Sequence, residues 1–485
     1  MRRVLKAAFS IYLFFFHAIF TSGFAGNPPN TYKHFPSGIP PDSLSLIIES
    51  AVDYLVATQI KKTIPEYQYT GEWPCYMVMD KPFFLLGVRK KVMDSNCFAL
   101  ASTHNVLAKI YLLRKQDNRI PDALSAARKA LLRYRNGNRF NFWNLLPPQR
   151  DLYRGDTDYA RKLVRRPTQF ELQTRYIHKA AHVAEDADDT ALSYTAFFLG
   201  AEISGSGEHT LPGEATQIAA LFDAYRDKNR KNRHWYNYLN DHHLKTNTGA
   251  FLTWHTTEYQ FKRWNILKVL GHNATFYMPW SECYPRAYVP YLPYGSNDFD
   301  AVVNANVLGA LALYDAKSAE GYQDAVQYLI KKCFRKKYDR VASYYPNRYQ
   351  FAFAVAMARS NGVNELDTCK GLLTGYLLSK QNKNGSWRSA YYINGGDRIQ
   401  STAYAINSLL MLHPHPDELL MRAIEKGIRY LVSQMIAEKN RIHWKGGVMF
   451  SGGTVVRTSL SWKSEAYTTA LIVHALCLYD QTIKN

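Results

Sequence analysis

Three acidic side chains, Asp186, Asp188 and Asp189, stand within a stretch that reads Asp-Ala-Asp-Asp-Thr-Ala. Carboxyl groups this close together cannot all ionise cheaply, so at least one is expected to keep its proton. The stretch opens a predicted helix, and the N-terminal end of a helix stabilises a carboxylate that has given up its proton. The cluster therefore has the chemistry of a general acid, although aspartate is also an ordinary N-cap residue.

Polar residues also stand at or near the start of other predicted buried helices. We expect substrate contacts from eight residues around one central pit: Trp73, Asp94, Asn96, His104, Asp298, Asp300, Asn304 and Glu465. Helix capping explains the opening residues equally well, and a lone His104 is more often a hydrogen-bonded core histidine. Capping does not explain Asn304 and Asn306 inside an apolar run, because buried amides need hydrogen-bond partners.

Two classes of helical segment must position these residues. One class is amphipathic at helical period, which is typical of a surface helix with one buried stripe. Its members are 43–60, 119–134, 213–226, 320–334, 366–381 and 417–434. The other class is apolar nearly all round and rich in small residues, which indicates burial. Its members are 94–114, 186–203, 298–315, 346–359, 400–413 and 464–480.

The two classes alternate strictly along the chain, six of each. Outer and inner helices in alternation predict an all-α protein with an (α/α)6 toroid fold, although an open superhelix has a similar pattern. The longest connections run from outer to inner helices, near 61–93, 135–185 and 227–297. Antiparallel hairpins place all of these loops on one face, where a functional mouth is expected. Short β-hairpins are expected in loops near Trp73, Trp254, Trp387 and Trp444.

The sequence of the fifth pair of helices resembles that of a known family. Lys370-Gly371, then Tyr376-Leu377-Leu378, then Gln381 to Trp387 resembles the QW repeat of the squalene–hopene cyclase and protein prenyltransferase superfamily. Weaker copies run from Tyr54 to Trp73 and from Tyr430 to Trp444. Physically, the Gln side chain can satisfy backbone groups near a helix end, and the Gly permits the turn.

The aspartate cluster resembles the DxDD motif of class II terpene cyclases, which begin by protonating an alkene or epoxide. The resemblance implies that Asp188, the middle position, is the proton donor, with Asp186 and Asp189 holding and tuning it. Aromatic side chains lining the cavity would then stabilise carbocations by cation–π contact. The implied substrate is a small or lipid-like prenyl compound. No cofactor and no metal are expected.

Two other functions remain open at this stage. Many exported (α/α)6 toroids are glycoside hydrolases or polysaccharide lyases with carboxylates in the same central pit. Tryptophans in predicted loops would suit sugar stacking: Trp73, Trp143, Trp235, Trp254 and Trp280. The formal charge of +20 would suit an acidic glycan, or peripheral contact with an anionic membrane surface. The third alternative is an exported binding toroid without chemistry.

The N-terminus reads as a secretory signal, with Arg2, Arg3 and Lys6 ahead of an apolar run from Ile11 to Phe20. We therefore expect a signal peptide at 1–25, a single toroid domain at 26–485, and an exported, periplasmic or secreted, monomeric protein. The six cysteines are too sparse to form a disulfide framework. No HExxH motif, Gly-rich phosphate loop or nucleic-acid-binding module is present, so nucleic acid is not an expected partner.

Overall fold

The computed structural model describes residues 41–78, 91–115, 117–147, 163–169, 183–205, 211, 214–228, 247–256, 300–336, 338, 341–342, 344–389, 395–451 and 461–484. One compact unit runs from Pro40 to the end of the chain. The predicted signal segment, 1–25, lies outside the described residues. Among the described helices, none combines the length and apolar character needed to cross a bilayer.

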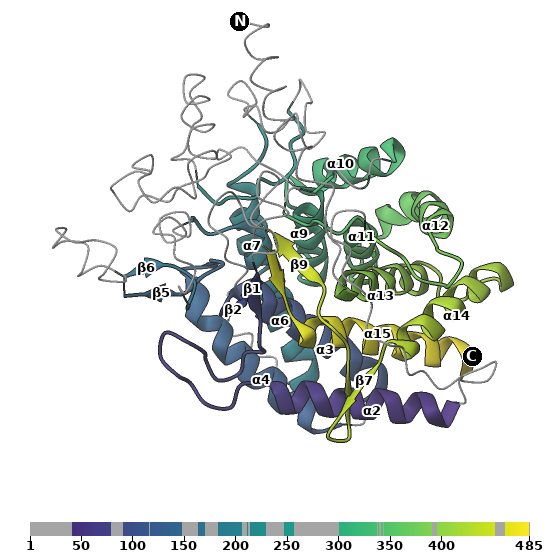
Figure 1. Ribbon diagram of the computed structural model, residues 1–485. Helices are drawn as coiled ribbons and strands as arrows, with labels where there is room; N and C mark the ends of the chain where they lie inside the picture. The colour runs from purple at the N-terminus through teal and green to yellow at the C-terminus, as the bar shows by residue number, and fades with distance from the viewer. Residues whose placement is uncertain are drawn as a thin grey trace, which may run out of the picture. The chain divides into compact units, whose positions relative to one another are not determined.

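Six helices of the described residues form the inner ring of the unit (Figure 1). They are α3 (Cys97–Arg114), α6 (Ala187–Ser204), α9 (Ala301–Leu313), α11 (Gln350–Ser360), α13 (Gly395–Leu412) and α15 (Glu465–Lys484). Each packs against the next, and α15 packs back against α3, so the ring is closed. Their burial on nearly every side follows from the apolar, small-residue composition of the segments.

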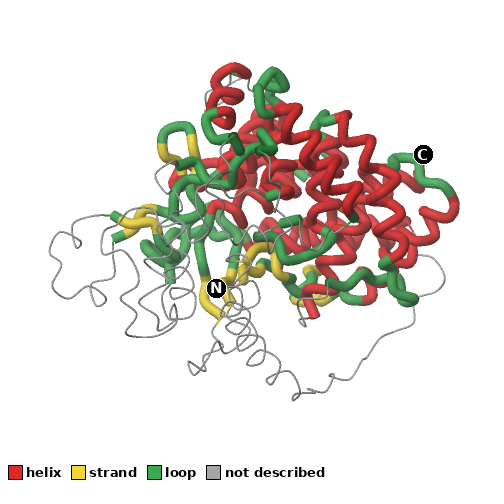
Figure 2. Tube along the Cα trace, turned by 90° about the horizontal axis from the view of Figure 1, so that it is seen from above, coloured by secondary structure: helices red, strands yellow, loops and turns green. Residues whose placement is uncertain are grey.

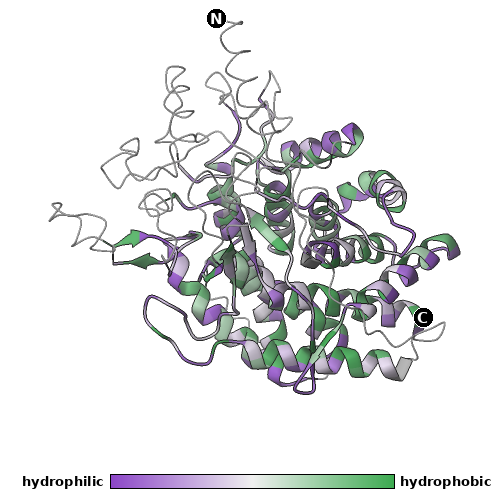
Figure 3. Ribbon diagram, in the orientation of Figure 1, coloured by the Kyte–Doolittle hydropathy of each residue, from purple (hydrophilic) through white to green (hydrophobic). Residues whose placement is uncertain are grey.

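The outer helices alternate with the inner ones along the chain and contact the ring from outside. They are α2 (Pro41–Thr58), α4 (Arg119–Leu131), α7 (Ala215–Asp223), α10 (Tyr322–Arg335), α12 (Lys370–Ser379) and α14 (Glu418–Ser433). A 3-10 helix, η6 (Asn364–Cys369), leads into α12, and another, η1 (Leu132–Tyr134), follows α4. Figure 3 shows hydrophilic and hydrophobic colours on the same helices, for example α10 and α14. The predicted all-α (α/α)6 toroid is confirmed.

The helix boundaries differ from the prediction mainly at two inner helices. Helix α11 begins at Gln350 rather than 346, because the Asn347 side chain accepts from the Tyr349 N–H in a local turn ahead of the helix. Helix α13 begins at Gly395, five residues before the predicted start. Apolar periodicity places the centre of a helix better than its first turn.

Short strands lie beside the helices rather than between them (Figure 2). A four-stranded sheet has the order β2-β1-β10-β9 and contains β1 (Tyr76–Val78), β2 (Lys91–Met93), β9 (Val448–Ser451) and β10 (Ser461–Lys463). Antiparallel pairing of β1 with β10 joins the first helical pair to the last. The two-stranded sheets are β3 (Arg135–Asn136) with β4 (Arg139–Phe140), β5 (Leu145–Leu146) with β6 (Val164–Arg165), and β7 (Ile436–Glu438) with β8 (Arg441–His443).

The β-hairpins expected from the sequence are found only in part. The β1–β2 pair follows Trp73, and β7–β8 precedes Trp444. Trp254 makes an isolated bridge with Asp186 instead of a hairpin. The residues described around Trp387 contain no strand.

Three tryptophans make the same contact in three helical pairs. The indole N–H groups of Trp73, Trp387 and Trp444 donate to the carbonyls of Leu55, Leu377 and Leu431, at 2.8, 2.8 and 2.7 Å. Each accepting leucine lies in the last turn of the preceding outer helix, where carbonyls lack helical partners. The tryptophans therefore fasten the ends of outer helices to the loops that lead inward.

Two glutamines tie neighbouring outer helices together. The Gln59 amide donates to the carbonyls of Gly71 and Ala123, and the Gln381 amide donates to those of Gly385 and Ala423. Gly71 and Gly385 adopt φ of 95° and 86°, a region that L side chains rarely enter. A Cβ at either position would lie 2.3 or 2.2 Å from a carbonyl oxygen of the next outer helix. Glycine is therefore required at both turns.

Candidate active site

The aspartate cluster opens α6, as the sequence predicts. Asp186 is the N-cap, with extended backbone, and its carboxylate accepts from the Asp189 N–H at 2.7 Å. Loop segments flank the motif on both sides: the Asp186 N–H donates to the Phe140 carbonyl, and the Ala187 N–H donates to the Thr253 carbonyl at 2.8 Å. Capping is thus one real function of Asp186, and it leaves Asp188 free of any capping role.

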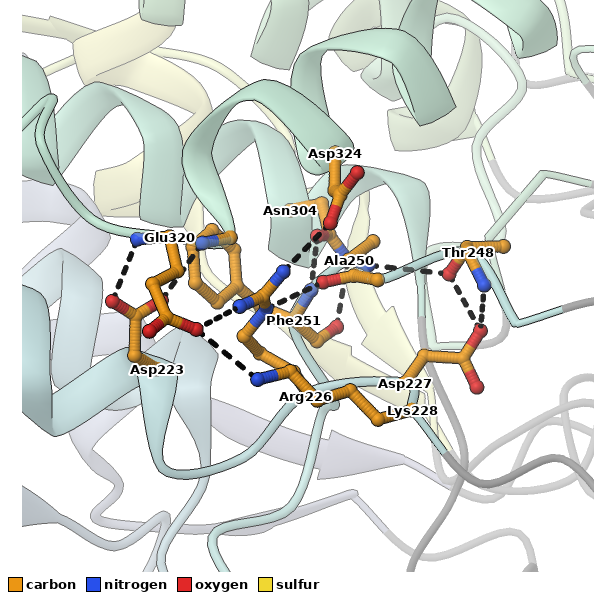
Figure 4. Close-up of polar contacts among 12 residues, drawn as sticks. Asp223, Arg226, Asp227, Lys228, Thr248, Ala250, Phe251, Asn304, Glu320 and Asp324 are labelled. Atoms are coloured by element: carbon orange, nitrogen blue, oxygen red, sulfur yellow. Dashed lines mark hydrogen bonds and ion pairs between the residues drawn. The ribbon is translucent and has the colours of Figure 1, made fainter.

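The segment 247–256 that flanks the motif is itself held by a polar network (Figure 4). The Asn304 amide clasps the Phe251 backbone, accepting from its N–H and donating to its carbonyl, both at 3.0 Å. Arg226 donates to the Gly249 carbonyl and pairs with Glu320 and Asp324. These contacts explain the buried Asn304 as a positioning residue for the backbone beside the acid cluster. The sequence indicates that Asn304 needs a buried partner but does not identify the Phe251 backbone as that partner.

Asp188 lies inside the helical ring with both carboxyl oxygens engaged. Its Oδ1 accepts from the Asn306 amide of α9 at 2.7 Å, and its Oδ2 accepts from the Tyr345 hydroxyl just before α11. Its side chain is only 6 % exposed. Burial raises the pKa of Asp188 well above its usual range, the neighbouring Asp186 raises it further, and the Asn306 hydrogen bond acts in the opposite direction. Burial and the neighbouring charge therefore favour the protonated form of Asp188 over its carboxylate.

The two other aspartates of the cluster are buried as well. Burial raises the pKa of Asp186 to about 6, and hydrogen bonds from the Asp189 and Asp188 backbone limit the rise. Burial raises the pKa of Asp189 strongly, and the charge of Asp186 adds to this. The pKa of each of the three aspartates is therefore raised, so the cluster resists carrying three negative charges.

A cavity lies inside the ring, and both hydrogen-bond donors to Asp188, Asn306 and Tyr345, line it, although Asp188 itself does not. Four inner helices supply most of its wall: α3, α6, α9 and α11. Phe98 and Phe353 are among its apolar lining residues. Of the described residues that line it, none carries a charge and none is a tryptophan. Its volume is ≈ 60 Å³, well below the roughly 150 Å³ that accommodates one benzene molecule.

The far end of this cavity is closed by a contact across the ring. Lys109 of α3 donates to the Asn361 side chain, which follows α11, at 2.6 Å. Helices α3 and α11 lie three positions apart in the six-membered ring and therefore face one another. Because Asn361 lines the cavity, this hydrogen bond forms its floor opposite Asp188.

An aromatic layer connects Asp188 to a second acidic group. It consists of Phe98, Phe142, Tyr345, Phe450 and Trp462. Successive ring centroids lie 5.0–5.7 Å apart along the path Tyr345–Phe98–Phe450–Trp462, with Phe142 against Phe450. Such faces can stabilise a cation by electrostatic attraction to the ring.

The second acidic group is Asp94, which stands before α3. Its carboxylate accepts from the indoles of Trp462 and Trp143, at 2.7 and 3.1 Å, and from the Asn96 amide. Burial raises the pKa of Asp94 to about 6. The sequence predicts Asp94 and Asn96 as site residues, and the structure places them together, beside the aromatic layer rather than in the cavity wall.

Glu72 belongs to this second group and is absent from the predicted set. It accepts hydrogen bonds from the Tyr134 hydroxyl at 2.7 Å and from the Ser95 hydroxyl. Burial raises the pKa of Glu72 to about 7. Its position between Gly71 and Trp73 in the first copy of the repeat offered no chemical signal.

The remaining predicted residues that the structure describes do not line the cavity. Trp73 is buried and bonded to the Leu55 carbonyl. His104 is fully buried within α3 beside Asn105, and burial lowers its pKa to about 3, so it stays neutral. Asp300 caps α9 by accepting from the Val302 N–H at 2.7 Å. Glu465 lies half-buried in the first turn of α15, and Asp298 lies outside the described residues.

The two donors that contact Asp188 were not among the predicted site residues. Asn306 did carry a signal, because an amide in an apolar helical run must find a buried partner. Tyr345 carried none: it stands among many tyrosines in a loop, and only the fold brings it two inner helices across to Asp188.

The described residues contain no group of three or more metal-ligating side chains in reach of one ion. Five described cysteines are free and buried: Cys75, Cys97, Cys333, Cys369 and Cys477. The sixth, Cys283, lies outside the described residues.

Comparison with protein-family models found no match, and neither did comparison with curated proteins. Solved structures do match. A variant of the type II terpene cyclase MstE from Scytonema, in complex with its substrate geranylgeranyl dihydroxybenzoate, superposes with a TM-score of 0.53 at 14% identity, over 91% of this chain and 98% of that one. A protein from Actinoplanes gives 0.51 at 12% identity, over 90% and 99%.

An unsaturated glucuronyl hydrolase specific for heparin gives a TM-score of 0.47 at 11% identity, over 92% of this chain and 98% of that one. At 14% and 12% identity, the matches to MstE and to the Actinoplanes protein show a shared α/α toroid fold and nothing finer. The chain has the terpenoid cyclase-like α/α toroid fold, and the choice among functions depends on its own residues.

Proposed function

We propose that this protein is a terpenoid cyclase-like enzyme that starts cyclisation by protonating a prenyl substrate, with Asp188 as the general acid. The observation that carries the proposal is a buried carboxyl group, with a raised pKa, whose two hydrogen-bond donors line an uncharged, partly aromatic cavity. An alkene is a very weak base, so its protonation requires a strong acid in a site that excludes water.

The surroundings of Asp188 stabilise its protonated form before the reaction and its carboxylate after the proton has left. Burial and the charge of Asp186 raise the pKa of Asp188 and so favour its protonated form before the reaction. Asn306 and Tyr345 donate to its two oxygens and stabilise the carboxylate formed when the proton leaves. In the first step the proton moves to one alkene carbon, the π electrons form the new C–H bond, and the other carbon becomes cationic. Phe98, Tyr345 and Phe450 present aromatic rings next to that region.

Substrate entry requires the described cavity to enlarge. A volume of ≈ 60 Å³ cannot hold a prenyl chain. The proposal therefore requires the side chains around the cavity to move apart when substrate binds. This requirement predicts slow substrate association compared with simple diffusion.

The glycan-active alternative finds less support in the described residues. A glycan-active enzyme needs an open polar groove with basic residues and with tryptophans that can stack on sugars. Trp73 and Trp143 are instead buried, and their indoles donate to the Leu55 carbonyl and to the Asp94 carboxylate, respectively. Trp235 and Trp280 lie outside the described residues. Export, a monomeric state and contact with an anionic membrane surface remain part of the proposal as sequence-based predictions.

The decisive experiment replaces Asp188 with asparagine and incubates the purified protein with prenyl substrates and, separately, with acidic glycans. Asp188→Asn keeps the shape of the side chain but cannot deliver a proton, so turnover of the prenyl substrate should be abolished. The melting temperature should stay unchanged or rise, because a buried acid next to Asp186 is removed. Asp417→Asn is the matched control, since Asp417 caps the outer helix α14; asparagine caps a helix about as well as aspartate, so this change should leave both activity and stability nearly unchanged. Full activity of Asp188→Asn would refute the proposal, and turnover of glycans alone would favour the alternative.

A further inference from the structure

Two buried thiols meet between outer elements of the toroid. Cys333 lies in the last turn of α10, and Cys369 is the last residue of η6, directly before α12. Helix α10 packs against η6, and neither cysteine side chain has any exposed surface. The two thiols share a side-chain hydrogen bond, which together with burial raises the pKa of Cys333. Because a disulfide holds its sulfur atoms about 2 Å apart, thiols already in contact need only small movements to form one.

The side chain of Tyr338 lies at the same place. Its hydroxyl donates to the Cys333 carbonyl at 2.8 Å. Burial raises the pKa of Tyr338, and the nearby Cys333 and Cys369 thiols both add to the rise. The centroid of its ring lies 4.4 Å from that of Tyr376 in α12 and 5.8 Å from that of Phe351 in α11. The thiol pair therefore belongs to a packed region where α10, η6, α12 and α11 meet.

The other described cysteines have different neighbours. The Cys97 sulfur lies 3.4 Å from the Ser193 hydroxyl oxygen, and the Cys75 sulfur accepts from an asparagine amide at 3.6 Å. The Cys477 thiol has a hydrogen bond with Arg114. Within the described part of the chain, the pair between α10 and η6 is thus the place where one thiol contacts another.

Burial of both sulfur atoms restricts bond formation to the time of folding. An oxidant cannot reach a thiol without exposed surface, and the raised pKa of Cys333 leaves little of the reactive thiolate in the folded state. Before α10 and η6 pack, the thiolate of one cysteine attacks an external disulfide, which forms a mixed disulfide and releases one thiol. The second cysteine then displaces the other thiol. The two S–H protons of the chain end on the two released thiols, and the external disulfide is the oxidant.

We propose that Cys333 and Cys369 form a disulfide bond when the chain folds in an oxidising compartment that supplies such an external disulfide. The export predicted from the N-terminal sequence would bring the chain to a compartment of this kind. The bond closes a loop over 334–368, which contains all of α11 and Tyr345, the donor to Asp188. A cross-link of this length restricts the unfolded chain and so stabilises the folded one. The bond is independent of the chemistry proposed for Asp188.

Peptide mapping of the full chain tests the bond directly. The protein is produced in cells with an oxidising cytoplasm, purified without reductant, alkylated in urea to block every remaining thiol, and digested with trypsin. Trypsin cleaves after lysine and arginine, so the bond should yield peptide 333–335 linked to peptide 360–370, and reduction should separate the two. Recovery of both peptides alkylated and unlinked would overturn the inference, as would a bond from either cysteine to a different one.

Thermal unfolding separates a covalent bond from simple packing of the thiols. Wild-type protein from oxidising cells should melt several degrees higher than the same protein from reducing cells, because only the former carries the cross-link. Cys369→Ala should melt at one temperature from either source. Cys477→Ala is the matched control: it also removes a buried thiol, and it should keep the difference shown by the wild type. A wild type without this difference, or a Cys369→Ala variant that retains it, overturns the inference, and the peptide map of the wild type decides the question if the variant does not fold.

Discussion

The hydroxyl of Tyr345 should set the acid strength of Asp188. Tyr345→Phe removes the hydrogen bond to the Asp188 Oδ2 and keeps the aromatic ring, whose centroid lies 5.7 Å from that of Phe98. A hydrogen bond to a charged group contributes about 1.5–3 kcal/mol, and one to a neutral group contributes about 0.5–1.5 kcal/mol. The variant therefore destabilises the carboxylate about 1–2 kcal/mol more than the protonated acid.

That difference converts directly into acidity and rate. The pKa of Asp188 should rise further, since 1.36 kcal/mol corresponds to one pKa unit. If proton transfer limits the reaction, the rate constant should fall by about 5- to 30-fold. Single-turnover kinetics with saturating substrate measures this step apart from binding and product release. A kinetic isotope effect in deuterated water would show that proton transfer is the step observed.

Tyr344→Phe provides the matched control. Tyr344 is the preceding residue, its hydroxyl accepts from the Trp254 indole at 3.2 Å, and its ring stacks on Phe450. The same hydroxyl is lost from the same loop, but no contact with Asp188 is removed. Equal rates for Tyr345→Phe and the wild type would refute the role of this hydrogen bond. An equal loss in both variants would assign the effect to the loop rather than to the acid.

Two further predictions concern stability. Gly385→Ala should lower the free energy of unfolding by about 1–3 kcal/mol, because φ is 86° and the new Cβ would lie 2.2 Å from the Lys426 carbonyl oxygen. Gly375→Ala in α12 should instead raise the free energy of unfolding by up to about 1 kcal/mol, because nothing lies within 4 Å of the new Cβ. Urea unfolding measures both, and equal effects of the two changes would contradict the reasoning. The second prediction is that Glu72→Gln stabilises the protein more at pH 8 than at pH 5. Burial raises the pKa of Glu72 to about 7 from 4.5, so the folded state holds this proton more tightly and wild-type stability falls as pH rises from 4.5 to 7. The penalty approaches about 3 kcal/mol above pH 7, and a pH-independent difference between the two proteins would show that Glu72 does not titrate in this way.

The alternation of outer and inner helices could be predicted because the residue composition of a helix indicates how much of its surface is buried. Runs such as 301–313 are apolar on every side and can only lie inside, so six such runs define the ring. The cap at Asp186 was equally local, since a short side chain before a helix bonds the backbone three residues on. Both inferences need only the neighbouring residues of the chain.

The partners of Asp188 were beyond such reasoning. Tyr345 is 157 positions from Asp188, and its approach depends on the packing of α6, α9 and α11 together. The same holds for Asp94, whose partner Trp462 lies 368 positions away on a strand that periodicity could not detect. For His104 the prediction was misled in the opposite direction. A histidine suggests a role in chemistry, but burial inside α3 keeps this side chain neutral and within the core.

The array of helical pairs has no terminal unit, because β1 pairs with β10 and α15 packs on both α2 and α3. An open array of repeats frays from its ends and needs polar caps there. Here the first and last pairs shield each other, so loss of α15 would expose two apolar faces at once rather than one. Unfolding should accordingly be a single cooperative event, and during synthesis the earlier pairs must wait for the last helix before their packing is complete.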